Sequence, residues 1–139
     1  MVLNQDFHIN IFLKNLKWAI LWALLIFILC AIPGRDIPSI SWLEMLSFDK
    51  WVHASLFFIL VYFSIDGLVK HQADRKKSYI FSLAFAIPYG GFLEIMQDIC
   101  FHERTADVYD FIANSFGAIM CTVFYTKTHT LVSRVLKSN

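Results

Sequence analysis

The chain has 139 residues, of which 58% are hydrophobic, and its formal net charge at pH 7 is only +1. Soluble domains carry about 45–50% apolar residues, so this composition and a mean hydropathy of +0.57 indicate a chain that folds in lipid. The weak net charge excludes the basic field that nucleic-acid binding requires, and no nucleic-acid partner is expected. The length suits one domain covering residues 1–139.

Four apolar segments follow one another along the chain, each near the roughly 20 residues that a helix needs to cross a bilayer. They cover about residues 16–32, 51–69, 78–97 and 106–126. Each is apolar on all sides, and none alternates every second residue as a barrel strand does. A soluble helical core would need long polar faces, which these segments lack. We therefore predict an all-α integral membrane bundle of four transmembrane helices.

The first segment follows Lys14 and Lys17, as the apolar part of a signal peptide would, and ends before Pro33. No small-residue cleavage site follows it, so we expect it to be retained as a membrane span. The connectors between the segments are short, which favours antiparallel packing of sequence neighbours.

Basic residues predict the orientation of the bundle. They precede the first span, fill the second connector and follow the fourth span, whereas the first and third connectors carry mixed charge. The residues concerned are Lys14, Lys17, Lys70, Arg75, Lys76, Lys77, Lys127, Arg134 and Lys137. Because cytoplasmic loops are enriched in Lys and Arg, we expect both termini in the cytoplasm and the first and third connectors outside.

Strongly polar residues gather at the outward ends of the second, third and fourth predicted helices. Within each helix they are spaced three, four or seven residues apart, so that they share one face. The candidate ligand-binding residues are Asp49, Lys50, His53, Glu94, Gln97, Arg104, Asp107, Asp110 and Asn114. One inward-facing site could contain all of them.

The depth of Glu94 supports a functional interpretation. It follows Ser78 by about 24 Å of helix and therefore still lies within a hydrocarbon core of about 30 Å. A carboxyl group there costs roughly 2.5–3.5 kcal/mol unless it faces protein or water, and such groups are functional candidates. The expected pairings are Arg104 with Asp107 or Asp110, and His53 with Glu94.

Four fragments with this spacing occur in order between residues 49 and 121: Asp49-Lys50-x-x-His53, Glu94-x-x-Gln97, Arg104-x-x-Asp107-x-x-Asp110 and Asn114-x-x-Gly117. Here the chain resembles the VanZ-like family of bacterial membrane proteins. It departs from the family at Glu103 and Cys121, where the family often has glycine. The resemblance implies a multi-pass protein of the bacterial inner (cytoplasmic) membrane and, by analogy alone, an accessory role in glycopeptide (teicoplanin) resistance.

Several functions stay open on these residues. The first is binding of a lipid headgroup, an envelope precursor or a lipophilic glycopeptide, with Arg104 and Lys50 holding an anionic group. The second is an enzyme acting on a lipid-linked, phosphate-bearing substrate at the outer leaflet, with His53 or Glu94 as general base and Asp110 as a second carboxylate.

The third is a transporter or proton path, for which a homo-oligomer would be needed. The simplest alternative is that the polar groups only bridge helices, at about 0.6 kcal/mol each. We rank binding first and membrane lipids as the expected partners. We predict no cofactor and assign no metal ligand, although the carboxylate and histidine set could bind a metal.

Overall fold

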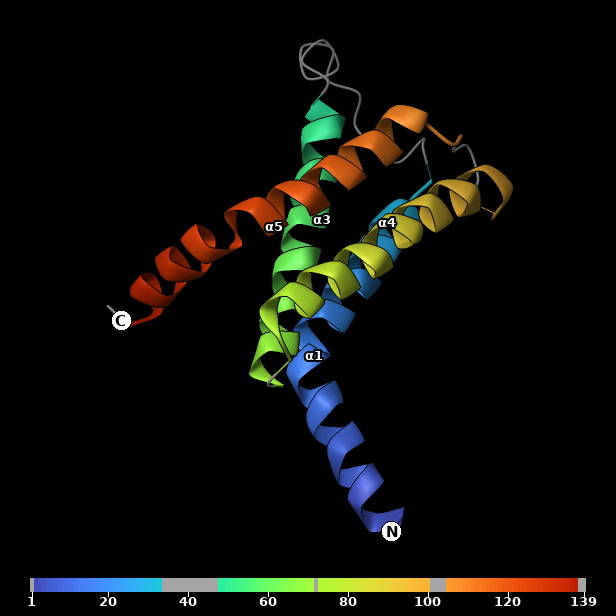
Figure 1. The fold of residues 1–139 in the computed structure, drawn as a ribbon. Coiled ribbons are helices and arrows are strands. Elements are labelled where there is room, and N and C mark those ends of the chain that lie inside the picture. Colours follow the sequence, from blue (N-terminus) through green and yellow to red (C-terminus); the bar gives the residue numbers. More distant parts are fainter. Residues whose placement is uncertain (1, 34–47, 72, 101–104, 138–139) are drawn as a thin grey trace.

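The computed structural model describes residues 2–33, 48–71, 73–100 and 105–137, and all regular structure within these ranges is helical. The four helices are α1 (Val2–Cys30), α3 (Phe48–Lys70), α4 (Arg75–Cys100) and α5 (Val108–Lys137), drawn in Figure 1. Each is long and apolar enough to cross a membrane. The prediction of an all-α fold with four potential membrane spans is confirmed.

Large apolar side chains cover the outside of the helices. Trp51, Phe81, Ile99 and Val123, from three different helices, are each more than half exposed. A water-soluble bundle would bury such residues, because exposed apolar area is unfavourable in water. This surface therefore suits acyl chains as the surrounding solvent.

Aspartate caps set where two of the helices begin. Asp74 Oδ1 accepts a hydrogen bond from the Lys77 N–H (3.1 Å), and Asp107 Oδ1 accepts one from the Tyr109 N–H (2.8 Å). These bonds satisfy amides that have no partner in the first helical turn. Accordingly α4 begins at Arg75 and α5 at Val108, whereas the sequence predicted starts near residues 78 and 106.

The other helix ends also differ from the predicted spans. Helix α1 ends at Cys30, two residues before the predicted end, because Pro33 disfavours helical geometry in the preceding residue. Helix α5 continues to Lys137, well past the expected end near residue 126. Hydropathy marks the apolar part of a helix, and it misses polar turns that extend beyond the membrane.

Helix α3 is the centre of the arrangement (Figure 1). It packs against α1, α4 and α5, whereas α1 and α5 make no close contact with each other among the described residues. Two glycines allow the backbones to approach. A Cβ on Gly67 would lie 2.6 Å from the Asn15 carbonyl oxygen of α1, and one on Gly117 would lie 1.9 Å from the Ala54 carbonyl oxygen of α3.

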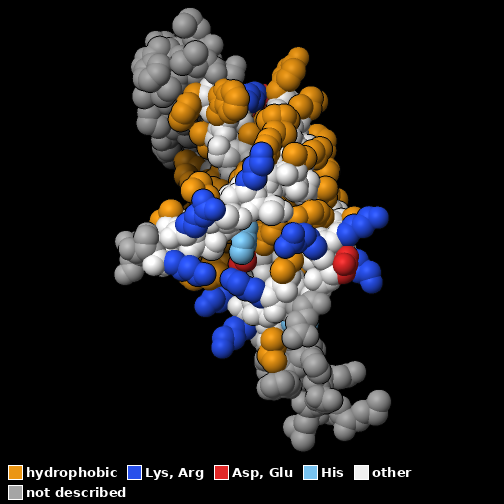
Figure 2. All heavy atoms as spheres, turned by 60° about the vertical axis from the view of Figure 1, so that its left-hand side comes forward, with side chains coloured by type: hydrophobic (Ala, Val, Ile, Leu, Met, Phe, Trp, Pro, Cys, Tyr) orange, Lys and Arg blue, Asp and Glu red, His pale blue; other side chains and the backbone are white. Residues whose placement is uncertain are grey.

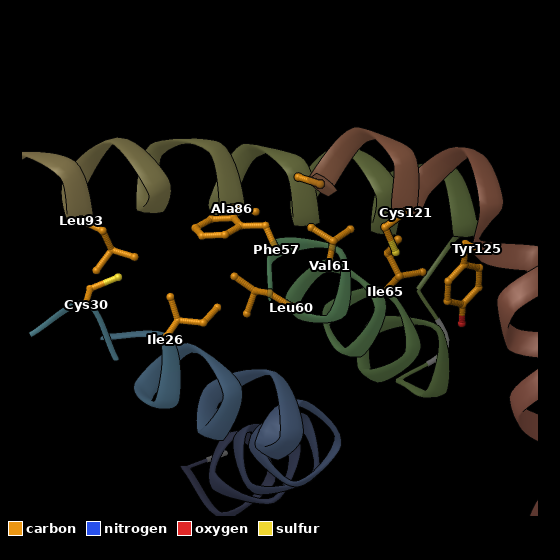
Figure 3. Close-up of a cluster of buried hydrophobic side chains, with 11 residues drawn as sticks. Ile26, Cys30, Phe57, Leu60, Val61, Ile65, Ala86, Leu93, Cys121 and Tyr125 are labelled. Carbon is orange, nitrogen blue, oxygen red and sulfur yellow. The ribbon is translucent and has the colours of Figure 1, made fainter. Parts of the chain in front are cut away.

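A core of buried apolar side chains joins all four helices (Figure 3). It includes Ile26 of α1, Phe57 of α3, Leu93 of α4 and Cys121 of α5, each at most 1% exposed. Burial of this kind keeps the helices in one register relative to each other. The core therefore fixes how the polar ends of α3, α4 and α5 meet.

Hydrogen bonds cross the same interfaces. The Trp22 indole N–H donates to the Leu56 carbonyl (2.9 Å), and the Tyr89 hydroxyl donates to the Ala23 carbonyl (2.7 Å). Both tie α1 to its neighbours. Ser82 donates to Ser64 at 2.9 Å within the buried α3–α4 contact (the Oγ atoms of both). Such bonds are favourable in lipid, where an unpaired polar group finds no water.

The bundle has one basic end and one acidic end. The connector between α3 and α4 is flanked by Lys70, Arg75, Lys76 and Lys77. Figure 2 shows a face on which Lys and Arg side chains gather and outnumber Asp and Glu. Carboxylates concentrate at the opposite end, where the candidate functional site lies.

Candidate functional site

Residues from three helices meet at the acidic end of the bundle. They come from the first turns of α3 (Asp49, Lys50 and His53), the last turns of α4 (Glu94 and Gln97) and the start of α5 (Asp107, Asp110 and Asn114). We call these residues the polar cluster. Antiparallel packing of neighbouring helices brings the ends together, and the contact of Gly117 with Ala54 holds α5 against α3.

Lys50 lies among carboxylates from two elements. Its Nζ is 2.5 Å from Asp107 Oδ2, 2.5 Å from Asp110 Oδ1 and 2.9 Å from Asp49 Oδ2. A lysine ammonium has three N–H donors, so these contacts engage all of them. Lys50 therefore has no donor left for an incoming anion in this arrangement.

His53 bridges two residues of α5. Its Nδ1 lies 3.2 Å from Asn114 Oδ1, and its Nε2 lies 3.6 Å from Asp110 Oδ2. An amide oxygen only accepts hydrogen bonds, so Nδ1 carries the ring proton and donates it to Asn114. In the neutral ring Nε2 then presents a lone pair toward Asp110.

Glu94 is a buried residue of the polar cluster, with only 6% of its surface exposed. Its Oε2 accepts a hydrogen bond from the Asp107 N–H at 3.1 Å. Its Oε1 is buried and has no hydrogen-bond partner within the described part of the chain. One atom able to coordinate a metal ion from each of Glu94, His53 and Asp110 lies within 4.8 Å of the others. The inner part of the cluster thus has more hydrogen-bond acceptors than hydrogen-bond donors.

The outer part of the cluster is open. The Asp49 side chain is 57% exposed and that of Asp107 is 39% exposed. Hydrogen bonds from the Lys50 ammonium and from the Tyr109 N–H hold the pKa of Asp107 below its ordinary value. Asp107 is therefore a carboxylate at neutral pH. Among the described residues the cluster holds four carboxyl groups and one ammonium, so acidic charge predominates.

The structure brings most of the sequence-predicted residues together, but with different pairings. Asp107 and Asp110, which were expected to pair with Arg104, contact Lys50. Arg104 itself lies outside the described residues. His53 was expected to pair with Glu94; it lies near Glu94, and its direct contacts are Asn114 and Asp110.

The remaining predicted residue, Gln97, lies one turn beyond Glu94 on α4 and is 3% exposed. It is buried on the same helix face as Glu94, as the spacing of three residues predicted.

Sequence reasoning missed two features of the site. It treated Lys50 as a free cation, although carboxylates of α5 surround it, and it did not recognise Asp107 as the residue that caps α5. The cap had a local signal, since an aspartate just before an apolar helical run is a typical N-cap. The pairing of Lys50 with Asp107 and Asp110 had none, because these two partners are distant in sequence.

Comparisons of the chain with protein-family models, curated proteins and solved structures find no match. The resemblance to the VanZ-like family consequently rests on its sequence fragments alone.

Proposed function

We propose that the chain is a VanZ-like membrane protein whose polar cluster binds the polar end of an amphiphilic ligand: a lipid headgroup, an envelope precursor or a lipophilic glycopeptide. The observation that carries this proposal is the polar cluster itself. Its acidic groups come from three helices, lie at one end of an apolar bundle and open outward at Asp49 and Asp107. Polar groups that only join helices would not need an open carboxylate rim or an acceptor without a donor, such as Glu94 Oε1.

The distribution of basic residues supports an orientation. Lys70, Arg75, Lys76 and Lys77 lie at the end of the bundle opposite the polar cluster. Under the positive-inside rule that end faces the cytoplasm, together with both termini. The polar cluster then faces out of the bacterial cytoplasmic membrane, where it meets outer-leaflet headgroups and envelope precursors.

The charge of the polar cluster restricts the class of ligand that it can bind. Its one described ammonium, on Lys50, is engaged by three carboxylates, so an anionic group would meet repulsion at the rim. An amine on the ligand would instead donate charge-assisted hydrogen bonds to Asp49 and Asp107. We therefore favour an amine-bearing headgroup, in place of the anion that the sequence suggested for Lys50 and Arg104.

The test is retention of lipid by the purified full chain, measured by native mass spectrometry from detergent. Phosphatidylethanolamine and phosphatidylglycerol with identical acyl chains are compared, with teicoplanin as a glycopeptide probe. One charge-assisted hydrogen bond contributes about 1.5 kcal/mol or more, so we expect roughly ten-fold stronger retention of the amine-bearing lipid.

A double variant identifies the site of retention. Asp49→Asn with Asp107→Asn removes the rim charge while asparagine preserves the helix cap, and we expect the preference to disappear. Asp66→Asn with Lys70→Gln, at the opposite end of α3, is the matched control and should retain it. Equal retention of both lipids by the unaltered chain, or loss of the preference in the control alone, contradicts the proposal.

The accessory role in resistance has its own test. The chain is expressed in a teicoplanin-susceptible bacterium, and the minimal inhibitory concentration is compared with that of cells expressing the Asp49→Asn/Asp107→Asn variant at equal membrane abundance. We expect higher tolerance only with the unaltered chain. Equal susceptibility of both strains removes the resistance role and leaves headgroup binding to be judged by lipid retention.

One observation favours an enzyme as the second candidate. In the neutral tautomer whose Nδ1–H donates to Asn114, the lone pair of His53 Nε2 faces Asp110 and lies near Glu94, an arrangement that could accept a proton from an attacking water. The substrate would be a lipid-linked, phosphate-bearing molecule of the outer leaflet. Release of phosphate from polyprenyl phosphate, or hydrolysis of a phospholipid to an alcohol and a phosphomonoester, abolished by His53→Gln, would support this function, and no turnover across both substrates would eliminate it.

A further inference from the structure

We propose that His53, Glu94 and Asp110 bind one divalent transition-metal ion, and that Zn²⁺ suits this set of donors best. The inference rests on the proposed function, because the ion would form the inner part of the same ligand site. It goes beyond that function by assigning the polar cluster an inorganic component and a distinct chemistry.

The first observation is the convergence of three donors from three helices. One atom from each residue lies within 4.8 Å of the other two, and His53 Nε2 is 3.6 Å from Asp110 Oδ2. Tetrahedral zinc with bonds of about 2.0–2.2 Å separates neighbouring donors by roughly 3.4 Å. The His53–Asp110 pair is already close to that spacing, and small side-chain rotations would bring Glu94 to it.

The second observation is independent of the clustering. Glu94 is 6% exposed, and its Oε1 has no hydrogen-bond partner within the described ranges. Buried acceptors in folded proteins are almost always paired, because an unpaired one loses its contacts with water and gains nothing. A cation between Glu94, His53 and Asp110 that is coordinated through Oε1 would satisfy this oxygen.

The third observation is that hydrogen bonds orient two of the three proposed metal-coordinating side chains. The Nδ1–H of His53 donates to Asn114 Oδ1 at 3.2 Å, and this leaves Nε2 free to coordinate. Histidines that bind metals nearly always donate their other ring N–H to an acceptor. The Asp107 N–H holds the second oxygen of Glu94 at 3.1 Å in the same way. Two of the three donors are thus already oriented by hydrogen bonds.

The donor set also selects among ions. An imidazole nitrogen with two carboxylates suits zinc, manganese or iron, whereas calcium prefers six to eight oxygens and magnesium keeps most of its water. Three protein donors leave a coordination position free, as in zinc sites that accept an exogenous ligand. A positive ion would also offset the acidic charge of the cluster. An oxygen of the bound headgroup could occupy the free position.

The direct test uses the unaltered full chain in detergent. The protein is treated with EDTA, freed of chelator and titrated with Co²⁺, which replaces zinc and absorbs visible light when coordinated by protein. We expect a saturable absorption band at one Co²⁺ per chain that Zn²⁺ displaces and Mg²⁺ does not. The absence of a saturable band that Zn²⁺ displaces overturns the proposal without reliance on any variant.

Variants then locate the ion. Glu94→Gln and His53→Gln each remove one donor at nearly constant volume, and we expect Zn²⁺ affinity to fall more than about 100-fold, because changes in the outer shell alone cost about 10–100-fold. Asp66→Asn is the matched control. Asp66 Oδ1 also lies 3.6 Å from a histidine nitrogen, His129 Nε2, but at the other end of the bundle.

The control should bind Zn²⁺ like the unaltered chain. Unchanged affinity in a monodisperse Glu94→Gln sample, or loss of the ion in Asp66→Asn, contradicts the assignment. If Glu94→Gln aggregates, the His53→Gln variant and the Co²⁺ titration of the unaltered chain decide the question.

The two proposals can fail separately. Metal uptake is measured without added lipid, and lipid retention is measured again after EDTA. Retention of phosphatidylethanolamine by a chain that takes up no metal overturns the metal site and leaves headgroup binding intact. Metal uptake by a chain that shows no lipid preference overturns headgroup binding and leaves the metal site intact.

Discussion

At the scale of single residues, the ammonium of Lys50 determines how two acidic groups at the start of α5 coexist. Asp107 and Asp110 both lie 2.5 Å from Lys50 Nζ. Without a cation between them, their carboxylates would repel each other in a partly buried environment of low effective dielectric. Lys50 is therefore a structural counter-ion for the start of α5.

Replacement of this cation should destabilise the bundle. We expect Lys50→Met, measured in EDTA by SDS-induced unfolding in mixed micelles, to lower the free energy of unfolding by about 2–3 kcal/mol, because hydrogen bonds to charged groups contribute about 1.5–3 kcal/mol. Lys70→Met removes the exposed i, i+4 pair with Asp66 and should cost at most about 1 kcal/mol. Equal effects of the two substitutions would show that Lys50 does not hold α5.

Asn114 offers a second test at this scale. It is 2% exposed and contacts His53, and it is not one of the three proposed ligands of the ion. We expect Asn114→Ala to weaken Zn²⁺ binding about 10–100-fold, the usual effect of a lost outer-shell partner, and Asn114→Asp to preserve it because the acceptor oxygen remains. The readout is Zn²⁺ competition against bound Co²⁺. If Asn114→Asp weakens binding as much as Asn114→Ala, the hydrogen bond to His53 does not orient the ring.

These residues also show what sequence could and could not predict of the site. Spacing of three and four residues correctly placed Glu94 and Gln97 on one helix face, and Asp110 and Asn114 on another. The partner of each charge depends on how the helices pack. Lys50 and Asp107 are separated by 57 positions, and no local pattern links residues so far apart.

At the scale of helices, close contact between α3 and α5 depends on the missing side chain of Gly117. A Cβ there would lie 1.9 Å from the Ala54 carbonyl oxygen and 2.8 Å from its Cα. These are backbone atoms, so no side-chain rotation can relieve the clash. The sequence alone did not reveal that Gly117 contacts Ala54, nor that Gly67 allows a similar approach between α1 and α3.

We therefore expect Gly117→Ala to destabilise the bundle by about 1–3 kcal/mol, the usual effect of overpacking. It should also weaken lipid retention and Zn²⁺ binding by the polar cluster. Gly91→Ala is the matched control, because its Cβ would lie 3.5 Å from the Phe111 ring, an ordinary contact. In a helix, alanine is also favoured over glycine. SDS-induced unfolding compares the two, and an effect of Gly91→Ala as large as that of Gly117→Ala would argue against the α3–α5 contact.

At the scale of the whole molecule, the orientation in the membrane can be tested with a native side chain. Cys100 is exposed at the end of α4 near the polar cluster, whereas Cys30 and Cys121 are buried. We expect a membrane-impermeant maleimide to label Cys100 in intact spheroplasts, because the positive-inside rule puts this end outside.

The matched probe is Lys77→Cys in a Cys100→Ser background, which lies in the first turn of the same helix. Helix α4 has 26 residues and so spans about 39 Å, enough to separate the two probes across the bilayer. Lys77→Cys should react only after lysis. The reverse pattern of labelling would mean that the polar cluster faces the cytoplasm, and Cys100→Ser alone should not be labelled in intact cells.

The four helices themselves were predictable, because uniform apolarity over membrane-spanning lengths needs no knowledge of packing. The central position of α3 was not predictable. Lipid-facing and protein-facing sides of a membrane helix are similarly apolar, and association depends on small residues and fit between surfaces. Gly67 and Gly117 mark those contacts, but a glycine in a sequence does not identify its neighbour.

The separation of Lys50 from its acidic partners also has a consequence for biogenesis. Asp107 and Asp110 follow it by 57 and 60 residues, so they are synthesised only after α3 and α4 have been translated. Until then Asp49 is the only one of its three carboxylate partners to have been made. A nascent chain truncated before residue 107 would therefore present an incompletely neutralised cation at the membrane surface, a feature by which quality-control proteases could distinguish unfinished chains from finished ones.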